Sequence, residues 1–131
     1  MVYGHRDRAQ QLASGSQDVY GEPMLVRNLN EIRAAGVDDA ANHAAAFLTA
    51  KAVDRVWLHL DADCLDDEVM PAVDRRLDGG LTPSEVGSLA RPLVQTGLIT
   101  GMDVTIYNPS LDSEDLAAGR LLLGVVKSIL A

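Results

Sequence analysis

An apolar run that leads straight into closely spaced carboxylates is the feature that most constrains this chain. The sequence VWLHL at 56–60 is followed directly by DADCLDD at 61–67. The run predicts a buried strand, and the acidic stretch after it predicts a turn at the carboxyl end of that strand. Because side chains alternate between the two faces of a strand, we expect Asp61 and Asp63 to project from the same side, a few ångströms apart.

Two carboxylates held this close indicate a metal site. They repel each other unless a proton or a cation lies between them. Paired oxygen ligands suit hard cations such as Mn²⁺ or Mg²⁺. Open α/β sheets also build their sites at the carboxyl ends of strands, where Asp61 and Asp63 fall. The alternative is a solvated acidic surface, because many acidic residues gather in this window, but an apolar strand directly before the pair makes exposure alone a poor explanation.

Length, charge and cysteine content limit the class of protein. The chain has 131 residues, of which 47% are hydrophobic, so we expect a single domain over 1–131 with a real core. Its net charge of −8 argues against nucleic acid or an anionic membrane surface as the main partner. No apolar run reaches membrane-spanning length, and no charged-then-apolar leader opens the chain. With Cys64 as its only cysteine, the chain has no internal disulfide and is expected to be cytoplasmic.

Hydrophobic periodicity predicts strands that alternate with helices. The predicted strands cover residues 1–3, 24–26, 56–60 and 98–107, and the predicted helices cover 28–36, 38–51, 82–94 and a carboxyl-terminal stretch. Residues 8–22 and 68–81 are polar and rich in turn residues, so we expect long loops there. This alternation implies right-handed crossovers and a parallel sheet.

Capping residues mark where two of these helices begin. Asn28, followed three residues later by Glu31, predicts a capped helix that ends at Gly36. The segment Thr82-Pro83-Ser84-Glu85 is a capping box with proline at the first helical position. Pro92 lies inside the pattern of this second helix and is expected to kink it or end it early.

The carboxyl-terminal helix carries an unusual amount of apolar surface. Asp112 or Ser113 is expected to cap it, which would place Glu114 and Asp115 favourably in its first turn. Its leucines, valines and isoleucine spread over more than one side. We therefore expect it to be sandwiched between the sheet and another element.

The acidic pair is part of a longer pattern. It comprises Asp61-x-Asp63, Asp66, Pro71-Ala72, Gly79-Gly80-Leu81-Thr82, Gly101-Met102-Asp103, Tyr107-Asn108-Pro109 and Leu111-Asp112. This pattern resembles the carboxyl-terminal half of the ureohydrolase family, which groups arginase, agmatinase and formimidoylglutamase. The resemblance covers most of the chain and keeps the family's spacing from 56 to 112.

The resemblance implies a fold, a metal and a reaction. The fold is a three-layer α/β/α arrangement with a mainly parallel sheet, and the cofactor is a pair of Mn²⁺ ions. In the family, a hydroxide that bridges the metals attacks the carbon of a linear amidine, a guanidino or formimino compound, and a C–N bond is hydrolysed. By matched position Asp61 and Asp63 are metal ligands. No catalytic residue is assigned, and a homo-oligomer is expected unless the amino-terminal half is missing.

Four further residues are candidates around the site. His59 shares a predicted strand face with the acidic pair and could join it, but it is expected to lie deeper and to pack or hydrogen-bond structurally, because sites form at strand ends. Asp103, in the middle of the next strand, is expected to orient groups around the metals. Asp66 and Asn108 are expected to line the site.

The chain departs from the family at several points. Its only histidines are His5, His43 and His59, so the Gly-Gly-Asp-His and Asp-Ala-His-x-Asp segments that carry the family's other metal ligands are absent. Asp67 stands where proline is common, and Ile106 stands where arginase-like members have a substrate-binding Glu. An alternative is therefore a catalytically incomplete half-domain that needs its amino-terminal half or a partner.

A second chemistry also uses Asp-x-Asp at a strand end. Phosphotransfer hydrolases with an aspartate nucleophile begin this way, but they usually have Thr or Val after the second Asp and a suitable Lys downstream. Cys64 after Asp63, and Lys127 within an apolar helical pattern, fit that chemistry badly.

Overall fold

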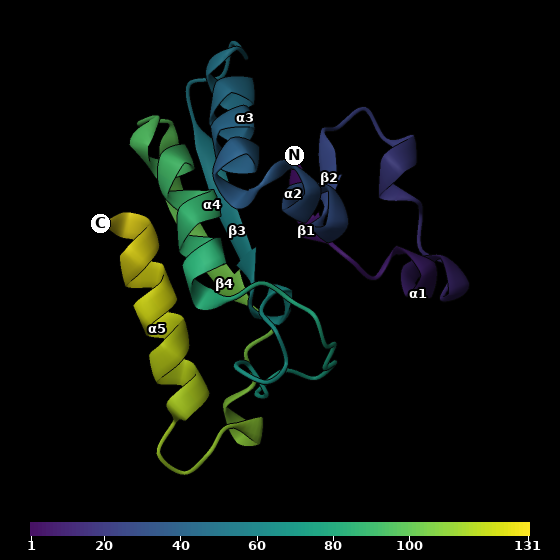
Figure 1. Ribbon diagram of the computed structural model, residues 1–131, viewed down its shortest axis with the longest axis vertical. Helices are drawn as coiled ribbons and strands as arrows, with labels where there is room; N and C mark the ends of the chain where they lie inside the picture. The colour runs from purple at the N-terminus through teal and green to yellow at the C-terminus, as the bar shows by residue number, and fades with distance from the viewer. The chain divides into compact units, whose positions relative to one another are not determined.

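The chain forms two compact units. The computed structural model describes residues 1–131, which divide into Met1–Gly36 and Val37–Ala131. Each unit contains its own parallel two-stranded sheet, as Figure 1 shows. The expectation of a single domain over 1–131 stays a prediction. No helix combines the length and apolar character needed to cross a bilayer.

The first unit pairs β1 (Val2–His5) with β2 (Val26–Asn28), followed by α2 (Leu29–Ala35). The predicted capping box of α2 is confirmed. The Asn28 side chain accepts a hydrogen bond from the Glu31 backbone N–H at 2.9 Å, and the Glu31 carboxylate accepts one from the Asn28 backbone N–H at 2.8 Å. The helix ends at Gly36, whose φ of 92° suits glycine.

The predicted loop over 8–22 is wrong in part. It contains α1 (Arg8–Ala13) and a single 3₁₀ turn, Val19–Gly21. No residue of α1 is buried, so the helix has no apolar stripe that periodicity could have revealed. Polar contacts hold it instead: the Gln11 amide donates to the Asp7 carboxylate at 3.0 Å.

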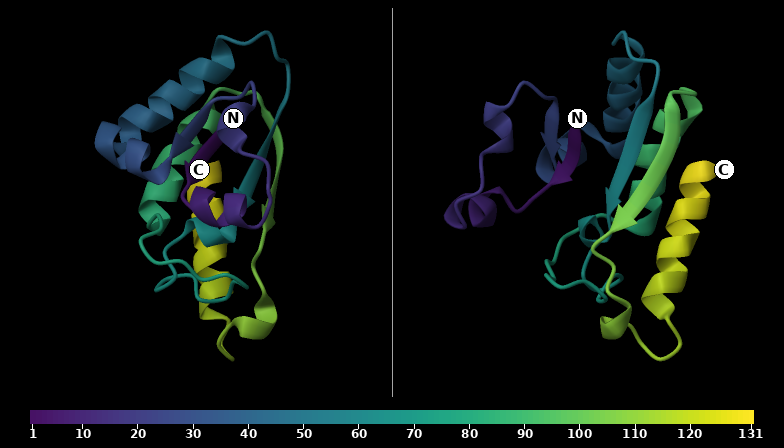
Figure 2. Two further views of the ribbon diagram at one scale, coloured as in Figure 1. Left: turned by 90° about the vertical axis from the view of Figure 1, so that its right-hand side faces the viewer. Right: turned by 180° about the vertical axis from the view of Figure 1, so that it is seen from behind.

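The second unit places helices against one face of its sheet. Its strands are β3 (Val56–Asp61) and β4 (Ile99–Thr105), and its helices are α3 (Val37–Thr49), α4 (Pro83–Gln95) and α5 (Ala117–Leu130). Helix α4 contacts both α3 and α5, and Figure 2 shows these helices on one side of the strands. The predicted α/β class with parallel strands is confirmed. Within this unit the opposite face of β3 and β4 carries no helix.

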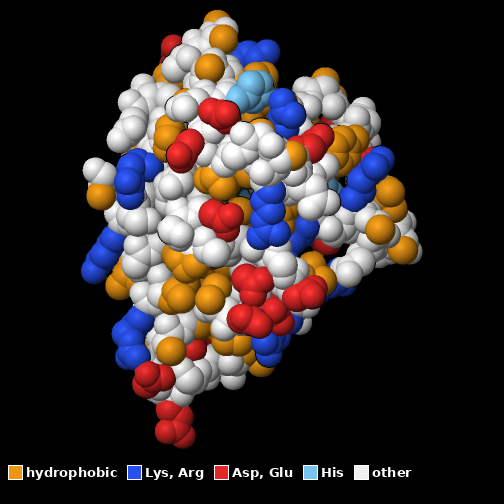
Figure 3. Space-filling model, viewed as in Figure 1, with side chains coloured by type: hydrophobic (Ala, Val, Ile, Leu, Met, Phe, Trp, Pro, Cys, Tyr) orange, Lys and Arg blue, Asp and Glu red, His pale blue; other side chains and the backbone are white.

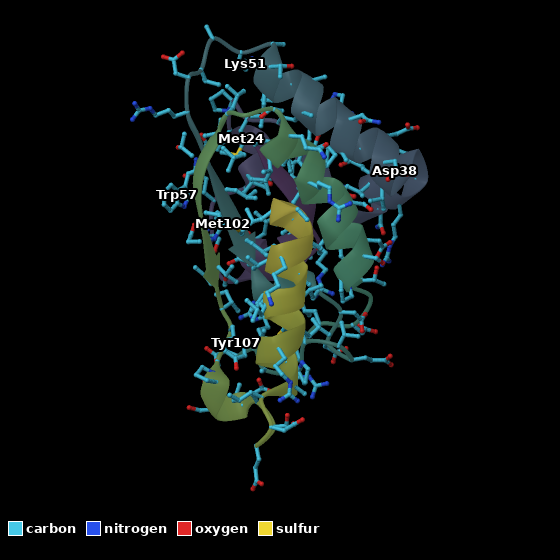
Figure 4. All side chains as sticks on the ribbon, turned by 90° about the vertical axis from the view of Figure 1, so that its left-hand side faces the viewer. Met24, Asp38, Lys51, Trp57, Met102 and Tyr107 are labelled. Atoms are coloured by element: carbon cyan, nitrogen blue, oxygen red, sulfur yellow. The ribbon has the colours of Figure 1, made fainter.

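Side-chain alternation on β3 separates the two faces. Leu60 is buried on the helix side, whereas Trp57 and His59 are exposed on the other side. In Figure 4 Trp57 points away from α4 and α5. The parallel register sets His59 beside Asp103 and Asp61 beside Thr105. Polar groups from both strands therefore share the uncovered face.

Helix α4 begins as predicted. The Thr82 hydroxyl accepts from the Glu85 backbone N–H at 3.2 Å, the Glu85 carboxylate accepts from the Thr82 backbone N–H at 2.7 Å, and Pro83 is at the first helical position. The expectation that Pro92 ends the helix early is wrong, because α4 continues to Gln95. The lost backbone hydrogen bond at Pro92 is offset by the buried face of this helix, which includes Leu89 and Leu93.

Helix α5 begins later than predicted, at Ala117. Glu114 and Asp115 therefore precede the helix and do not lie in its first turn. The capping function of Asp112 is nevertheless real, because its carboxylate accepts hydrogen bonds from the backbone N–H groups of Ala118 at 3.0 Å and Gly119 at 2.9 Å. Leu116, at φ 54°, turns the chain so that Asp112 reaches the N–H groups of Ala118 and Gly119, six and seven positions after it.

One face of α5 is buried and another is exposed. Leu122, Val125 and Ile129 are buried, whereas Leu123 is 54% exposed and Leu130 is 57% exposed. The expectation that α5 is covered on two sides is therefore wrong in this structure. The apolar residues fill one stripe at helical spacing and continue beyond it.

Asp112 makes the stability of the second unit sensitive to acid. Partial desolvation by itself raises the pKa of this carboxyl, but hydrogen bonds from Gly119, Ala118, Tyr107 and Ser113 outweigh it and lower the pKa from 3.8 to about 2. A lowered pKa in the folded state stabilises the fold above the unfolded value, and this stabilisation is lost as the pH falls toward about 2. We expect Asp112→Asn to lower the melting temperature at pH 7 and to flatten the loss of stability between pH 4 and 2.

Circular dichroism at several pH values measures this effect. Glu114→Gln is the control, since it removes a neighbouring carboxylate that caps no helix, and it should leave the profile almost unchanged. An Asp112→Asn profile that matches the wild type would contradict the capping role.

Candidate metal centre

The predicted metal ligands lie at the end of β3 and in the turn after it. Asp61 is the last residue of the strand, and Asp63 lies in the 3₁₀ turn Ala62–Cys64. The strand-alternation argument therefore does not extend to Asp63. The chain turns here because Ala62 and Leu65 are drawn into the core, at 0% and 1% exposure. The assignment of Asp61 and Asp63 as ligands stays a prediction.

Asp66 holds this turn in shape. One of its carboxylate oxygens accepts from the Gly80 backbone N–H at 3.0 Å, and the other accepts from the Glu68 backbone N–H at 3.0 Å. Two backbone hydrogen bonds also join the segment 64–66 to Leu81. The Asp66 N–H donates to the Leu81 carbonyl at 3.0 Å, and the Leu81 N–H donates to the Cys64 carbonyl at 2.9 Å. Asp66 thus organises the backbone that carries Asp63.

Asn108 joins the end of β4 to the loop between β3 and α4, which we call the acidic loop. Its side-chain amide donates to the Asp74 carboxylate at 2.8 Å, and its side-chain oxygen accepts from the Ser110 backbone N–H at 3.0 Å. Its own backbone N–H donates to the Ala72 carbonyl at 2.8 Å. The observed contacts of Asn108 are therefore with the loops that follow β3 and β4.

That acidic loop bears a dense group of carboxylates. Glu68, Asp74 and Asp78 are exposed, and Figure 3 shows acidic side chains gathered in the region of the loop between β3 and α4. These three exposed carboxylates form the kind of solvated acidic surface that the sequence offered as the alternative to a metal site. Asp61 and Asp63 are only partly exposed, which sets them apart from this group.

Asp103 holds two aromatic rings against the uncovered face of the sheet. Its Oδ2 lies 2.9 Å from His59 Nδ1, and its Oδ1 accepts from Trp57 Nε1–H at 2.5 Å. These two N–H groups occupy both oxygens, so Asp103 orients the side chains of His59 and Trp57. The expectation that it orients groups around the metals stays a prediction. The expectation that His59 lies deep in the structure is wrong, because its side chain is 54% exposed.

His59 also faces the predicted metal ligand Asp61. His59 Nε2 lies 3.2 Å from Asp61 Oδ1 and 3.4 Å from the Thr105 hydroxyl, which itself donates to Asp61 Oδ1. The hydrogen bond with Asp103 is the main cause that raises the pKa of His59, and the charge of Asp61 adds to it against partial desolvation. Hydrogen bonds from Trp57 and then His59 lower the pKa of Asp103.

Trp57 and Thr105 were not identified from the sequence. A usable signal existed for Trp57, which lies two residues before His59 and so shares its strand face. Thr105 is the register partner of Asp61 on β4, and register cannot be read without the sheet.

The carboxylates suit Mn²⁺ chemically, but the donor set is incomplete. Oxygen ligands are appropriate for this cation. However, the chain contains no group of three or more His, Cys, Asp or Glu side chains arranged to hold a metal ion. The side chains of this chain therefore do not form a complete metal site.

The chain is similar to arginases in sequence. The arginase from Staphylococcus aureus (strain COL) is 32% identical over 90 residues, which cover 69% of this chain and 30% of that protein. The arginase from Agrobacterium fabrum (strain C58 / ATCC 33970) is 35% identical over 86 residues, which cover 64% of this chain and 26% of that protein. The matched segments are thus less than a third of either relative.

Solved structures and a family model agree with these relatives. Arginase from Bacillus cereus superposes with a TM-score of 0.79 at 25% identity, and arginase from Bacillus subtilis with 0.76 at 27%. Each superposition covers 99% of this chain but only 43% and 44% of those chains, so this chain spans less than half of their length. The model of the arginase family matches residues 1–131. This chain belongs to the arginase family.

Proposed function

We propose that this chain supplies part of the active site of a manganese-dependent hydrolase that cleaves a C–N bond of a linear amidine. The observation that carries the proposal is the family match over 1–131, together with Asp61 at the carboxyl end of β3. Asp61 and Asp63 are the proposed metal ligands. A guanidino or formimino compound is the proposed substrate class.

The residues of this chain have defined tasks in such a site. Thr105 and His59 hold one oxygen of Asp61, and Asp66 fixes the turn that carries Asp63. A pair of divalent cations supplies the chemistry, because it lowers the pKa of a bound water and stabilises the negative charge that develops during attack. Rigid carboxylates matter here because coordination geometry decides how a metal functions.

The chain alone is proposed to be an incomplete half-domain. The specific observation is the incomplete donor set described above, together with a span of less than half of the related structures. A metal held by few protein ligands binds weakly. The remaining ligands, including histidines, are proposed to come from an amino-terminal half or from a partner chain.

The proposed substrate is a class of compounds and is not restricted to arginine. Ile106, which directly follows β4, is 45% exposed. It provides no carboxylate to face a guanidinium at that point. Agmatine, arginine and formiminoglutamate are therefore all substrates to be compared.

Hydrolysis assays with added Mn²⁺ test this proposal. We expect little release of urea or ammonia from any of the three compounds by the 131-residue chain alone. Turnover is expected when a polypeptide that carries the histidine ligands is supplied with it. Efficient turnover by the isolated chain would contradict the proposal that it is an incomplete half-domain. Failure of every combination to hydrolyse any of the three compounds would contradict the proposal that it is part of an amidine hydrolase.

A further inference from the structure

The parallel pair of β3 and β4 has one face that no helix of its unit covers. Parallel sheets occur almost only where helices cover both faces, because the connections between parallel strands place helices there. In the second unit the helices lie on one side of the strands, as Figure 2 shows. The other side therefore lacks the layer that such a sheet normally has. We call the residues that point to it the open face: Trp57, His59, Asp61, Gly101, Asp103 and Thr105.

Trp57 is the main apolar group of the open face. Its exposed fraction of 63% is the highest among the exposed large hydrophobic residues of the chain, and Figure 4 shows it pointing away from α4 and α5. A covered tryptophan side chain buries about 150–250 Å², and tryptophan is enriched among the residues that dominate binding energy in protein interfaces. The open face thus carries a large apolar area without cover.

Trp57 is held in one position although it is exposed. Its indole N–H donates to Asp103 Oδ1 at 2.5 Å, and its ring lies directly over Gly101, where a Cβ atom would clash with three ring atoms. A ring that is already oriented loses little conformational freedom when a partner covers it, so more of the contact energy contributes to affinity. The open face therefore presents a preorganised aromatic anchor.

Asp61, the proposed metal ligand, lies at the other end of the open face. Its neighbours Leu60 and Ala62 are buried at 9% and 0% exposure, whereas the Asp61 side chain is 47% exposed. A polypeptide that adds ligands to a metal on Asp61 therefore approaches from the open face. The strand rises about 13 Å from Trp57 to Asp61. A helix of about nine residues spans that length.

The length of the related chains indicates what covers this face. This chain accounts for only 43% and 44% of the superposed arginase structures, so more than half of each of those chains lies outside the match. We propose that the polypeptide with the histidine ligands lays a helix across the open face, with Trp57 packed beneath it as the main anchor. This inference rests on the proposed function and adds to it the surface by which the two parts join. The helix presents an apolar side chain to Trp57 and polar side chains to His59 and Asp61.

The fluorescence of Trp57 tests the proposal, because Trp57 is the only tryptophan of the chain. The probe is the amino-terminal half of the arginase from Bacillus cereus, coexpressed as a separate chain with phenylalanine in place of every tryptophan and purified without metal. We expect a complex in which the emission of Trp57 shifts to the blue and acrylamide quenches it less. Absence of a complex would overturn the proposal, and so would a complex in which acrylamide quenches Trp57 as strongly as in the isolated chain.

Three substitutions show whether Trp57 anchors the complex. Trp57→Glu should weaken binding about 30-fold or more, the loss that defines a dominant interface residue. Gly101→Ala should weaken it too, since the new Cβ atom displaces the ring without removing it. Leu123→Glu is the matched control, because Leu123 is 54% exposed on α5, away from the open face, and this variant should bind like the wild type. Analytical ultracentrifugation measures the affinities, and equal binding by Trp57→Glu and the wild type would refute the anchor.

Further outcomes separate this inference from the proposed hydrolase. The binding assay contains no Mn²⁺ and no substrate. A complex that protects Trp57 but shows no turnover after Mn²⁺ is added supports docking on the open face and contradicts the hydrolase. Turnover by a complex whose Trp57 stays exposed contradicts only the docking. Self-association of the isolated chain that protects Trp57 would identify a second copy as the occupant and would overturn the proposal.

Discussion

Gly80→Ala is expected to lower the free energy of unfolding by about 3 kcal/mol or more, at the upper end of the range for overpacking. A Cβ atom at this position would lie 2.4 Å from the Asp66 backbone nitrogen and 2.4 Å from the Leu65 carbonyl carbon. Backbone atoms cannot move aside as a flexible side chain can, so the two segments must separate. The hydrogen bond from Gly80 N–H to the Asp66 carboxylate would be lost with them.

Gly124→Ala is the matched control for this substitution. Nothing lies within 4 Å of a Cβ atom built at Gly124, which is within α5. Alanine there should stabilise the helix by about 0.5–1 kcal/mol, because glycine loses more conformational freedom on folding. Chemical denaturation measures both changes. Similar stabilities for Gly80→Ala and the wild type would show that the acidic turn does not depend on the contact between 65–66 and 80.

If the proposed function holds, Asp61→Ala and Asp63→Ala are expected to abolish amidine hydrolysis when the chain is combined with a polypeptide that supplies histidine ligands. Losing an outer partner of a metal ligand typically reduces affinity or activity by about 10–100-fold, so losing a direct ligand should reduce activity more than about 100-fold. The same variants should bind less Mn²⁺, which ties the loss to the metal. Metal analysis after gel filtration, alongside steady-state rates, measures both effects.

Asp54→Ala is the control for these two variants. Asp54 is exposed and precedes the amino end of β3, so it belongs to the same acidic window but lies at the opposite end of the strand. Its replacement should leave activity and manganese content close to the wild type. Retained turnover in Asp61→Ala or Asp63→Ala would rule out the ligand role of that residue.

The sequence predicted the start of a helix well where a short local motif decides it. The Thr82 capping box and the Asn28 capping box form as expected, because each needs only a side chain three residues from its partner. The class of the fold followed from alternating strands and helices. The position of Asp61 at the end of β3 followed from an apolar run that stops at a carboxylate.

Contacts that depend on tertiary structure were not predictable in the same way. The Trp57–Asp103 hydrogen bond and the Thr105–Asp61 hydrogen bond join residues on neighbouring strands, and only the register brings them together. The start of α5 was misplaced because the chain makes a left-handed turn at Leu116, which local capping rules do not anticipate. Helix α4 passes Pro92 because tertiary burial outweighs a local penalty.

Calorimetric titration of the isolated 131-residue chain with Mn²⁺ distinguishes a complete two-metal site from a partial one. We propose that this member of the arginase family carries only part of a two-metal ligand set. We expect weak binding without two resolved tight sites, because coordination by Asp61 and Asp63 leaves the geometry of both ions unmet. Tight binding of two Mn²⁺ ions by the chain alone would contradict the claim.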